Sequence, residues 1–493
     1  MERQVGFAKP SKGVDTGHGD DERAVVKPIR VLFAAAEAAP VARVGGLAEA
    51  AAGLIRALRN RDDVEVMVVL PDYDGFPLEG ETHSDLDLPE WAQPATVRTG
   101  TAPQLGEVHL VSVPGMAKPH PYVDASGNGW PDNTERLFGF SAAVAKLTER
   151  WSPDVLHLND WHTALALGWT DTPSVYTIHT LGYQGEADIG WLRNVMTERG
   201  AAFDRYGTLN PAAGAIRLAD TIVAVSPNYA AEILDPARSA GLHAILSARG
   251  DALTGIRNGI DASIWNPAAD PLVPTPYSAA DPTPKDVARA ALLETVGWGA
   301  DDDVPTIGMV TRLVEQKGID IALGLVPYLE RMRARLVLLG SGEERLSLWA
   351  KDLASRHPDH LHFVDGYDVR LAHSIFAGSD LFLMPSRFEP CGLAQMQAMA
   401  YGSIPVVTPV GGLVDTVFDA DEADRETGNG FMSLTVDGLG VLDALHRAVA
   451  AWRDLARRRA IQWAGMAEDW SWEGPAEHHM KLYRDLLPGD ASE

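Results

Sequence analysis

The sequence predicts an α/β protein of two doubly wound domains, each with a Rossmann-like parallel sheet, facing each other across a cleft. Three observations predict this fold class. The chain has 493 residues and is 46% hydrophobic, which suits two domains of roughly 200 residues better than one core. Short apolar runs alternate with helical patterns, as in parallel sheets covered on both faces. A Pro-rich stretch from Pro267 to Pro284 separates two such series.

The first series begins after a polar, aperiodic segment, residues 1–27, which we expect to be a flexible tail. The run IRVLFAA predicts the first strand, and a Gly-Gly turn followed by a helical apolar pattern comes directly after it. This series assigns residues 28–275 to an N-terminal domain. Its strands are expected at residues 29–35, 64–70, 108–113, 155–157, 174–178 and 221–225.

The second series repeats the pattern and assigns residues 285–465 to a C-terminal domain. After it, residues 466–493 are expected to contain a helix that carries the aromatic residues Trp470, Trp472 and Tyr483. In parallel sheets ligands bind beyond the carboxyl ends of the strands, so the cleft between the two sheets is the expected site. The strands of this domain are expected at residues 306–310, 335–339, 362–364, 381–384 and 404–407.

The composition excludes several classes of partner. Lys and Arg number 42 and Asp and Glu 68, which gives a net charge of −26 and argues against nucleic acid or an anionic membrane. The single cysteine, Cys391, permits no disulfide within the chain and no cysteine metal cluster. No apolar run approaches the ~20 residues that span a bilayer, and no secretory signal is visible, so we expect a cytoplasmic protein.

Two Gly-Gly turns, one in each half, follow apolar strands and open helices. Gly45 and Gly46 follow Arg43 in the first half, and Gly411 and Gly412 follow a strand in the second. Glycines allow close approach of a ligand, and backbone N–H groups at a helix start attract phosphate. Each turn alone could be a simple tight connection. The pair predicts a diphosphate held between the domains.

Arg312 and Lys317 lie five residues apart in TRLVEQKG, just beyond the strand TIGMV. Two cations there could neutralise a leaving diphosphate. The alternative is a surface pair near Glu315.

The turn SRFEPCGL follows another apolar strand and aims Glu389 at the cleft, where it could bind hydroxyl groups or stabilise positive charge. We interpret Cys391, in the same turn, as a small packed residue rather than a nucleophile. We assign Cys391, Gly392 and Leu393 to the same donor-binding turn.

His157, Asp160 and His162 crowd the segment HLNDWHTAL, and His179 ends the strand SVYTI. Such a cluster could suggest a metal. No H-E-x-x-H motif or cysteine partner accompanies it, so no metal is expected.

The chain resembles the bacterial glycogen synthase and starch synthase family from Ile29 to about Leu487. The resemblance implies the GT-B fold and metal-independent, retaining transfer of a sugar from a nucleotide diphosphate. It also implies a C-terminal helix that crosses back to the first, acceptor-side domain. The motifs that carry it are PVARVGGLAEAAAGL, PYVDASGNGWPDNTERLFGFS, DVLHLNDWHTALA, VYTIHTLGYQG, ADTIVAVSPNYAAEI, IRNGIDASIWNPAAD, VTRLVEQKGID, PSRFEPCGLAQ, VGGLVDTV and WSWEGPAEHHMKLY.

The resemblance also implies roles for single residues. Arg312 and Lys317 match the donor diphosphate pair, and Glu389 matches the active-site glutamate. The other matches are His179 for the donor-sugar histidine, Asp160 for the cleft aspartate, Asn258 for a cleft asparagine, and Gly45, Gly46, Gly411 and Gly412 for the phosphate loops, beside which Arg43 is assigned to donor binding. No cofactor is expected beyond the nucleotide sugar, which is a substrate.

The chain departs from the family pattern at Arg43, Val44, Thr180, Ala213 and Val410, where the family has Lys, Thr, Asn, Lys and Thr. These changes leave alternatives open. One is a pseudo-glycosyltransferase of aminocyclitol biosynthesis, of the acarbose type, which joins a nucleotide-linked cyclitol to an amino sugar. Another is a catalytically silent sugar-binding protein. The acceptor is accordingly a carbohydrate or a cyclitol, and the base, the sugar and the oligomeric state are not predicted.

Overall fold

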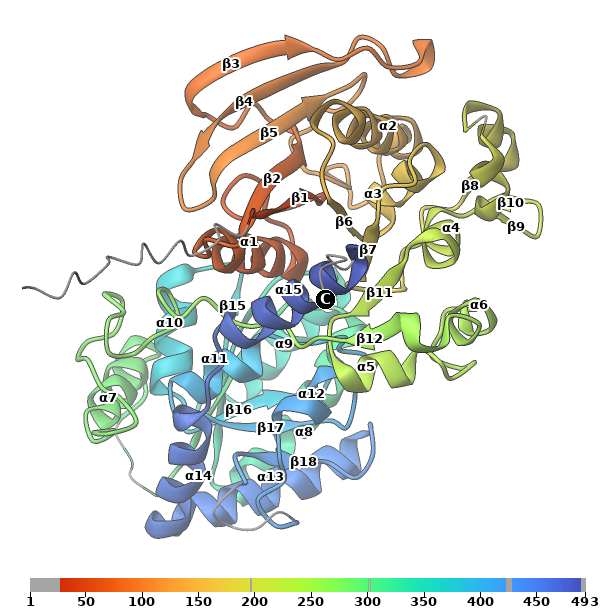
Figure 1. Ribbon diagram of the computed structural model, residues 1–493. Helices are drawn as coiled ribbons and strands as arrows, with labels where there is room; N and C mark the ends of the chain where they lie inside the picture. Colours follow the sequence, from red (N-terminus) through yellow and green to blue (C-terminus); the bar gives the residue numbers. More distant parts are fainter. Residues whose placement is uncertain (1–26, 196, 300, 302, 423–427, 489–493) are drawn as a thin grey trace, which may run out of the picture.

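The computed structural model describes residues 27–195, 197–299, 301, 303–422 and 428–488. Most of the expected tail, residues 1–26, lies outside the described residues, as do residues 489–493. Figure 1 shows two α/β halves, one above the other, each built on its own mainly or fully parallel sheet. This arrangement confirms the predicted fold class.

The sheet of the first half has nine strands, and seven of them are parallel neighbours. The other two form an antiparallel edge that sequence patterns did not predict, because the outermost strand, EGETHSD, is exposed along its whole length. In order across the sheet the strands are β12 (Leu253–Gly255), β11 (Thr221–Ala224), β7 (Ser174–Ile178), β6 (Val155–Asn159), β1 (Ile29–Ala34), β2 (Val64–Pro71), β5 (Gly106–Ser112), β4 (Thr96–Ala102) and β3 (Glu79–Asp85).

Side chains along β1 alternate between two cores, as a strand covered on both faces requires. Leu32 and Ala34 pack in the apolar cluster that contains three helices of this half, and Val31 and Phe33 pack with its first helix and with the last helix of the chain, α15 (Glu473–Leu486). The helices of this half are α1 (Gly46–Arg59), α2 (Asn133–Trp151), α3 (Trp161–Ala164), α4 (Pro211–Leu218), α5 (Pro227–Glu232) and α6 (His243–Ser247), with a small sheet of β8 (Ala187–Asp188), β9 (Asp204–Arg205) and β10 (Thr208–Leu209).

The second half has a six-stranded, fully parallel sheet. Its strands are β15 (Leu361–Asp365), β14 (Arg335–Gly340), β13 (Thr306–Val310), β16 (Leu381–Met384), β17 (Ile404–Val407) and β18 (Phe431–Met432). One face is covered by α8 (Ile319–Met332), α9 (Glu344–Arg356) and α13 (Gly438–Arg453), and the other by α7 (Lys285–Thr295), α10 (Val369–Gly378) and α11 (Ala394–Ala400). Also present are α12 (Gly412–Thr416), α14 (Leu455–Ala467) and the short 3-10 helix η6 (Glu315–Lys317).

The Pro-rich connection packs on the second half. Tyr277 donates its hydroxyl proton to the carbonyl of Tyr401, at 3.0 Å, and Lys285 Nζ donates to the carbonyls of Tyr401 and Ala377, at 2.9 and 2.7 Å. These carbonyls end α11 and α10, where a cation is favourable. Burial lowers the pKa of Lys285 to about 7.

The last helix, α15 (Glu473–Leu486), returns to the first half and packs beside α1 (Figure 1). Tyr483 reaches His157 of β6, with 2.6 Å between the hydroxyl oxygen and Nδ1. Just before α15, Trp472 packs on α1 at Gly53, where any larger residue would overlap the indole ring. The segment that follows the second half is therefore held by the core of the first.

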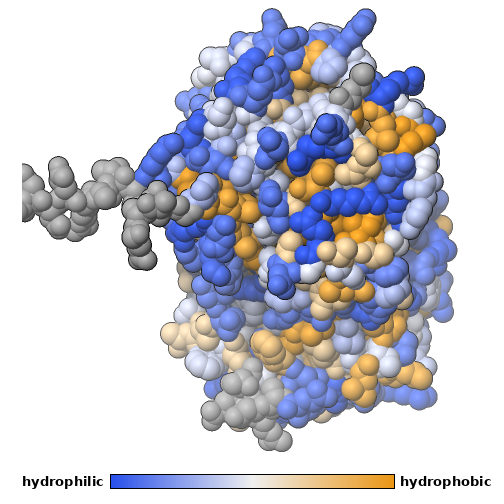
Figure 2. Space-filling model, turned by 45° about the vertical axis from the view of Figure 1, so that its right-hand side comes forward, coloured by the Kyte–Doolittle hydropathy of each residue, from blue (hydrophilic) through white to orange (hydrophobic). Residues whose placement is uncertain are grey.

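The face brought forward in Figure 2 is largely hydrophilic, with apolar residues in separate patches. Among the described residues, none of the helices has both the length and the hydrophobicity needed to span a bilayer.

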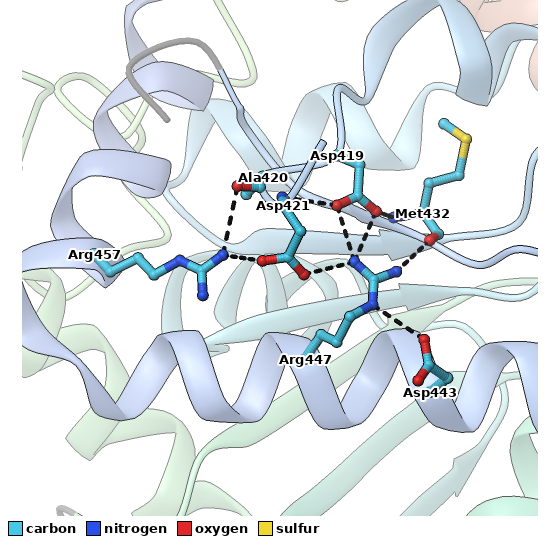
Figure 3. Close-up of polar contacts among 7 residues, drawn as sticks. All are labelled: Asp419, Ala420, Asp421, Met432, Asp443, Arg447 and Arg457. Atoms are coloured by element: carbon cyan, nitrogen blue, oxygen red, sulfur yellow. Dashed lines mark hydrogen bonds and ion pairs between the residues drawn. The ribbon is translucent and has the colours of Figure 1, made fainter. Parts of the chain in front are cut away.

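An arginine secures the far edge of the second sheet (Figure 3). Arg447 Nη1 lies 2.9 Å from Asp419 Oδ1 and 2.8 Å from Asp421 Oδ2, and its Nε lies 3.1 Å from Asp443 Oδ2. Its Nη2 also donates to the carbonyl of Met432 in β18. This network ties the two-residue strand β18 to α13 and explains how so short a strand is held.

Candidate active site

The carboxyl ends of the two sheets meet at a set of contacts between the halves. Ser226, after β11, donates its hydroxyl proton to the carbonyl of Pro390, at 2.8 Å. Asn228 Nδ2 donates to the carbonyl of Gly411, at 3.0 Å, and its backbone N–H donates to the Asp415 carboxylate, at 2.9 Å. Two loops of the second half are thereby fixed against the loop after β11, which places the cleft where the fold predicts it.

Lys317 and Glu389 form an ion pair inside this cleft, with Nζ and Oε2 2.6 Å apart. The Ser386 hydroxyl donates to the same oxygen, at 3.1 Å, and Glu389 is only 6% exposed. The two turns come this close because Gly318, with φ +65°, packs on the carbonyl of Pro385, where a Cβ atom would overlap it. The structure thus joins two residues that the sequence places 72 positions apart.

Arg312 lies on the turn after β13, five residues before Lys317, with an exposed side chain. Because this side chain is already exposed, its guanidinium group can contact a ligand without first moving out of the protein interior. It lies on the same connection, between β13 and α8, as Lys317.

His179 follows β7 and is held by two neighbours from the end of β6. Its backbone N–H donates to Asp160 Oδ1 at 2.8 Å, and its Nε2 lies 2.9 Å from Asn159 Oδ1. Asn159 donates its own Nδ2 to the carbonyl of Ala34, at 3.0 Å, so its oxygen faces the histidine. The imidazole therefore carries its proton on Nε2 and leaves Nδ1 as an acceptor.

Burial sets the protonation of both residues. It lowers the pKa of His179 to about 3, with a smaller contribution from His479, so the ring is neutral near pH 7. Burial raises the pKa of Asp160 to about 7, although the backbone N–H groups of His179 and Thr180 oppose the shift. Asp160 also has φ 54°, an uncommon value for a residue with a side chain. A positive φ and a raised pKa therefore occur together at Asp160.

The first Gly-Gly turn is bound by a carboxylate, that of Glu37, which the sequence analysis did not identify. Glu37 accepts hydrogen bonds from the backbone N–H groups of Val44 and Gly45, at 2.6 and 3.2 Å, and from the Tyr122 hydroxyl, at 2.6 Å. These two amides are therefore engaged and not free for a phosphate. A Cβ atom added at Gly45 or Gly46 would meet nothing within 4 Å, so these glycines leave open space for a ligand.

The second Gly-Gly turn is packed tightly instead. Gly411 N–H donates to Glu232 Oε1, at 3.0 Å, and Gly412 N–H donates to the carbonyl of Glu389, at 3.1 Å. A Cβ atom at either glycine would overlap the backbone of the 389–391 turn. Here glycine permits close approach of two protein loops, and the protein itself occupies the amides that the sequence suggested for phosphate.

The remaining predicted donor residues surround these loops. Cys391 is buried, which raises the pKa of its thiol to about 12, so it is not a thiolate nucleophile near neutral pH. The backbone amide of Asn258 bonds to this thiol, and Asn258 lines the same small cavity as His179. Gly392, with φ +74°, and Leu393 lead from the turn into α11.

Arg43 connects the first half to the second half at the opening of the cleft. Its Nε pairs with Glu49 at 2.8 Å, and its Nη2 donates to the Tyr367 hydroxyl of the second half, at 3.3 Å. This contact joins the first Gly-Gly turn to the loop after β15.

His162 is a further residue near the site whose role the sequence left open. Its Nδ1 is buried without a hydrogen-bond partner among the described atoms, and burial lowers its pKa to about 3. Tyr122 and Trp161 pack against its ring. A buried polar atom without a partner is unusual in a folded protein. No group of three or more metal-ligating side chains occurs within the part of the chain that the structure describes.

Comparison with known proteins agrees with this geometry. Residues 30–248 match the starch synthase catalytic domain, and residues 295–432 match the glycosyl transferases group 1. The glycogen synthase of Halorhodospira halophila is 42% identical over 480 residues, covering 93% of this chain and 99% of that protein. The glycogen synthase of Alkalilimnicola ehrlichii is 40% identical, covering 94% and 99%.

Solved structures show the same similarity. The catalytic domain of Starch Synthase IV from Arabidopsis thaliana, bound to ADP and acarbose, superposes with a TM-score of 0.84 at 31% identity and covers 93% of this chain and 99% of that one. The sucrose-phosphate synthase from Thermosynechococcus elongatus, at 19% identity, covers 93% of this chain and 99% of that one and shares the fold, with a TM-score of 0.59.

The fold and the cleft define a retaining glycosyltransferase of the GT-B type that uses a nucleotide sugar. Nearly the whole chain matches proteins of one family at about 40% identity. The chain belongs to the glycogen and starch synthase family, which confirms the predicted resemblance. These relatives do not favour the pseudo-glycosyltransferase or the silent sugar-binding protein.

Proposed function

We propose that the enzyme transfers glucose from ADP-glucose to the terminal 4-hydroxyl group of an α-glucan, with retention at the anomeric carbon and without a metal or other cofactor. One observation carries the proposal. Residues of both halves are connected around the cleft. Lys317 and Glu389 form an ion pair in the second half, and Cys391 in the same turn as Glu389 accepts a hydrogen bond from the backbone of Asn258. Asn258 in turn lines one small cavity together with His179. The relatives named glycogen synthase and the starch synthase bound to ADP and acarbose support the choice of donor and acceptor.

In this proposal the protein positions the reactants and stabilises charge. The bond between C1 of the sugar and the diphosphate oxygen breaks, and the acceptor oxygen bonds to C1 from the same face. The leaving diphosphate takes the acceptor proton. Lys317 and Arg312 neutralise the charge that develops on the diphosphate, which is the largest task in such a transfer.

Asp160 and His179 act on the sugar side of the cleft. The Asp160 carboxylate fixes the backbone of His179 and Thr180 through its Oδ1, at 2.8 and 3.4 Å. His179 is neutral and offers a ring acceptor to a sugar hydroxyl group. Glu389, which is held by Lys317 and Ser386, stabilises positive charge on the ring from the other side.

The departures from the family pattern fall into two groups. Ala213 is fully buried and Val410 is 2% exposed, and both pack in the apolar cluster rather than at an open surface. Arg43, Val44 and Thr180 lie on cleft loops and can contact a substrate. Arg43, Val44 and Thr180 are therefore the departures that can bear directly on substrate specificity, and the relatives named glycogen synthase favour a glucan over an aminocyclitol substrate.

A competition among donors and acceptors tests the proposal. The specificity constant kcat/KM is measured for ADP-, UDP-, GDP- and dTDP-glucose with glycogen and with maltose. We expect ADP-glucose with glycogen to exceed the other donors by about tenfold or more, because one unmatched polar group costs ~1–3 kcal/mol. A GDP-linked cyclitol or a dTDP-linked amino-deoxy sugar that is preferred with a short acceptor would instead restore the aminocyclitol reading.

A further inference from the structure

The last helix, α15, carries two polar side chains into the interior of the first half, close to the strand that ends at His179. His479 is 3% exposed, and Tyr483 is fully buried. Apolar residues of the same helix, such as Met480, already pack in the core beside α1. Because a buried polar side chain costs free energy unless it is paired, we asked what the two polar residues contact.

Both of them contact His157 of β6. The Tyr483 hydroxyl oxygen lies 2.6 Å from His157 Nδ1. The ring of His479 stacks on that of His157, with 5.5 Å between the ring centroids and 21° between the planes. On its other side, His157 Nε2 lies 2.7 Å from the hydroxyl oxygen of Thr177. His157 therefore connects the last helix to β7.

Thr177 lies two residues before His179, so their side chains share one face of the strand. The carbonyl of Thr177 accepts from the backbone N–H of Asp160, at 2.9 Å, and Asp160 Oδ1 accepts from the backbone N–H of His179. Thr177, His179 and His479 also line the same small cavity. The last helix thus meets the surroundings of His179 twice, through His157 and across this cavity.

The hydrogen bonds fix the proton of His479. Its Nδ1 lies 2.8 Å from the carbonyl oxygen of Pro475, which can only accept, so Nδ1 carries the proton and Nε2 is an acceptor. Burial lowers the pKa of His479 to about 4 and that of His179 to about 3. Both rings are therefore neutral near pH 7 and can line one cavity without repelling each other.

We propose that His479 is a positioning residue for His179. Together with Tyr483 it fixes His157 and, through His157, the side chain of Thr177, and its own ring closes the cavity beside His179. The imidazole of His179 thereby keeps the orientation in which it accepts from the donor sugar. The inference rests on the proposed role of His179 toward a sugar hydroxyl group, because His479 acts through His179 rather than on the reactants.

The variant His479→Asn tests this role. The asparagine amide can still donate to the carbonyl of Pro475 from near the position of Nδ1, but it does not reach the position of Nε2. We expect kcat with the preferred donor to fall about tenfold, because a small misplacement of a group that positions the reactants is costly. Calorimetry should show an unchanged Kd for ADP, which lacks the transferred sugar. His479→Gln reaches the position of Nε2 with its carboxamide oxygen and should restore about half or more of the wild-type kcat.

Two controls on the same helix separate positioning from packing. His478→Asn changes the neighbouring histidine, which is exposed, and should leave kcat and the thermal midpoint unchanged. Met480→Ala truncates a fully buried apolar side chain, so it should lower the thermal midpoint and retain kcat. If Met480→Ala lowers kcat as much as His479→Asn does, the helix acts only by packing and the proposal is overturned.

A double-mutant cycle with His179→Ala decides whether His479 acts through His179. We expect His479→Asn to cause no further loss of kcat in the His179→Ala background. Losses that multiply would overturn the proposal. If His479→Asn does not fold, Tyr483→Phe replaces it in the same cycle, since it removes only the hydroxyl group that holds His157, and the same two outcomes apply.

The single variants separate this inference from the proposed function. A wild-type kcat for His179→Ala would reject the role of His179 in the proposed reaction. A large loss for His179→Ala with a wild-type kcat for His479→Asn would reject the positioning role of His479 alone.

Discussion

At the residue scale, the cleft places opposite charges together before any substrate is bound. The Lys317 ammonium lies against a nearly buried Glu389 carboxylate, and that carboxylate also accepts from Ser386. A lone carboxylate at this position would cost desolvation energy, so the lysine stabilises it in the free enzyme. When a diphosphate arrives, the same ammonium can face both anions.

We predict that Lys317→Ala lowers kcat/KM about a hundredfold, because one lost contact to developing charge costs roughly 3 kcal/mol. Steady-state kinetics with the preferred donor checks this. The control is Lys351→Ala, which breaks an exposed ion pair with Asp365 at 2.6 Å, and it should retain wild-type activity. A Lys317→Ala enzyme with wild-type kinetics would remove the diphosphate role.

The raised pKa of Asp160 predicts a stability effect of defined sign. Its pKa rises from 3.8 to about 7 on folding, so between these values the unfolded chain loses the proton and the folded chain keeps it. Wild-type stability therefore falls as pH rises through this window, by about 4 kcal/mol from this group. Asparagine does not titrate and has nearly the same size and shape as aspartate, so the substitution removes the titration with little change in packing.

We thus expect the thermal midpoint of Asp160→Asn to rise relative to that of the wild type as the pH increases from 4 to 8. Differential scanning fluorimetry at intervals of one pH unit checks this. A constant difference between the two proteins across the range would show that Asp160 is not shifted.

Single residues also show what the sequence could and could not predict about the site. Lys317, Glu389 and His179 follow apolar strands, so their placement at the carboxyl ends of the sheets is readable from the pattern. Glu37 and Asn159 occupy equivalent positions but were overlooked, because their partners are backbone groups and a histidine distant in sequence. The pairing of Lys317 with Glu389 depends on the close approach at Gly318, which no local pattern encodes.

At the element scale, the two Gly-Gly turns resemble each other in sequence and differ in structure. The turn before α1 has open space at Gly45 and Gly46, whereas the turn before α12 is pressed on the backbone of residues 389–391. The first turn leaves room for a ligand, and the second lets two protein loops meet.

Alanine at each turn should separate these uses. We expect Gly46→Ala to keep the wild-type thermal midpoint and to raise KM for the donor, because a methyl group fills ligand space. Gly411→Ala should lower the midpoint by several degrees, since its φ of +46° and the nearby Glu389 carbonyl both oppose a Cβ atom. Gly438→Ala, at an unobstructed helix start, is the control. Equal effects at Gly46 and Gly411 would contradict this distinction.

The strands also separate into those that the sequence predicts and those that it does not. The sequence predicted the buried parallel strands, because continuous apolar runs are unmistakable between polar turns. It did not predict β3, whose side chains are all exposed, or β18, which has two residues and depends on the Arg447 network in Figure 3. Such strands are set by their neighbours rather than by their own side chains.

At the scale of the whole molecule, the contacts between the halves are uneven. On one side of the cleft, Asn228 bonds to both Gly411 and Asp415, and Ser226 bonds to Pro390. At the opening, Arg43 donates one exposed hydrogen bond of 3.3 Å to Tyr367, and its guanidinium group lies 5.9 Å from the centre of the tyrosine ring. Opening of the cleft would therefore break the Arg43–Tyr367 contact and keep the contacts around Asn228 as the hinge side.

The last prediction concerns this closure. We expect the wild-type enzyme to become more compact in small-angle scattering when saturating ADP is added, because groups from both halves must converge on the donor. Arg43→Ala removes the contact at the opening, so the free variant should be more expanded than the free wild type. ADP should still compact it, since Lys317 and Arg312 remain. Arg205→Ala, far from the opening, serves as the control and should match the wild type in both states. If Arg43→Ala and the wild type give the same radius of gyration without ADP, the contact does not hold the cleft. If ADP changes neither protein, the halves do not close around the nucleotide.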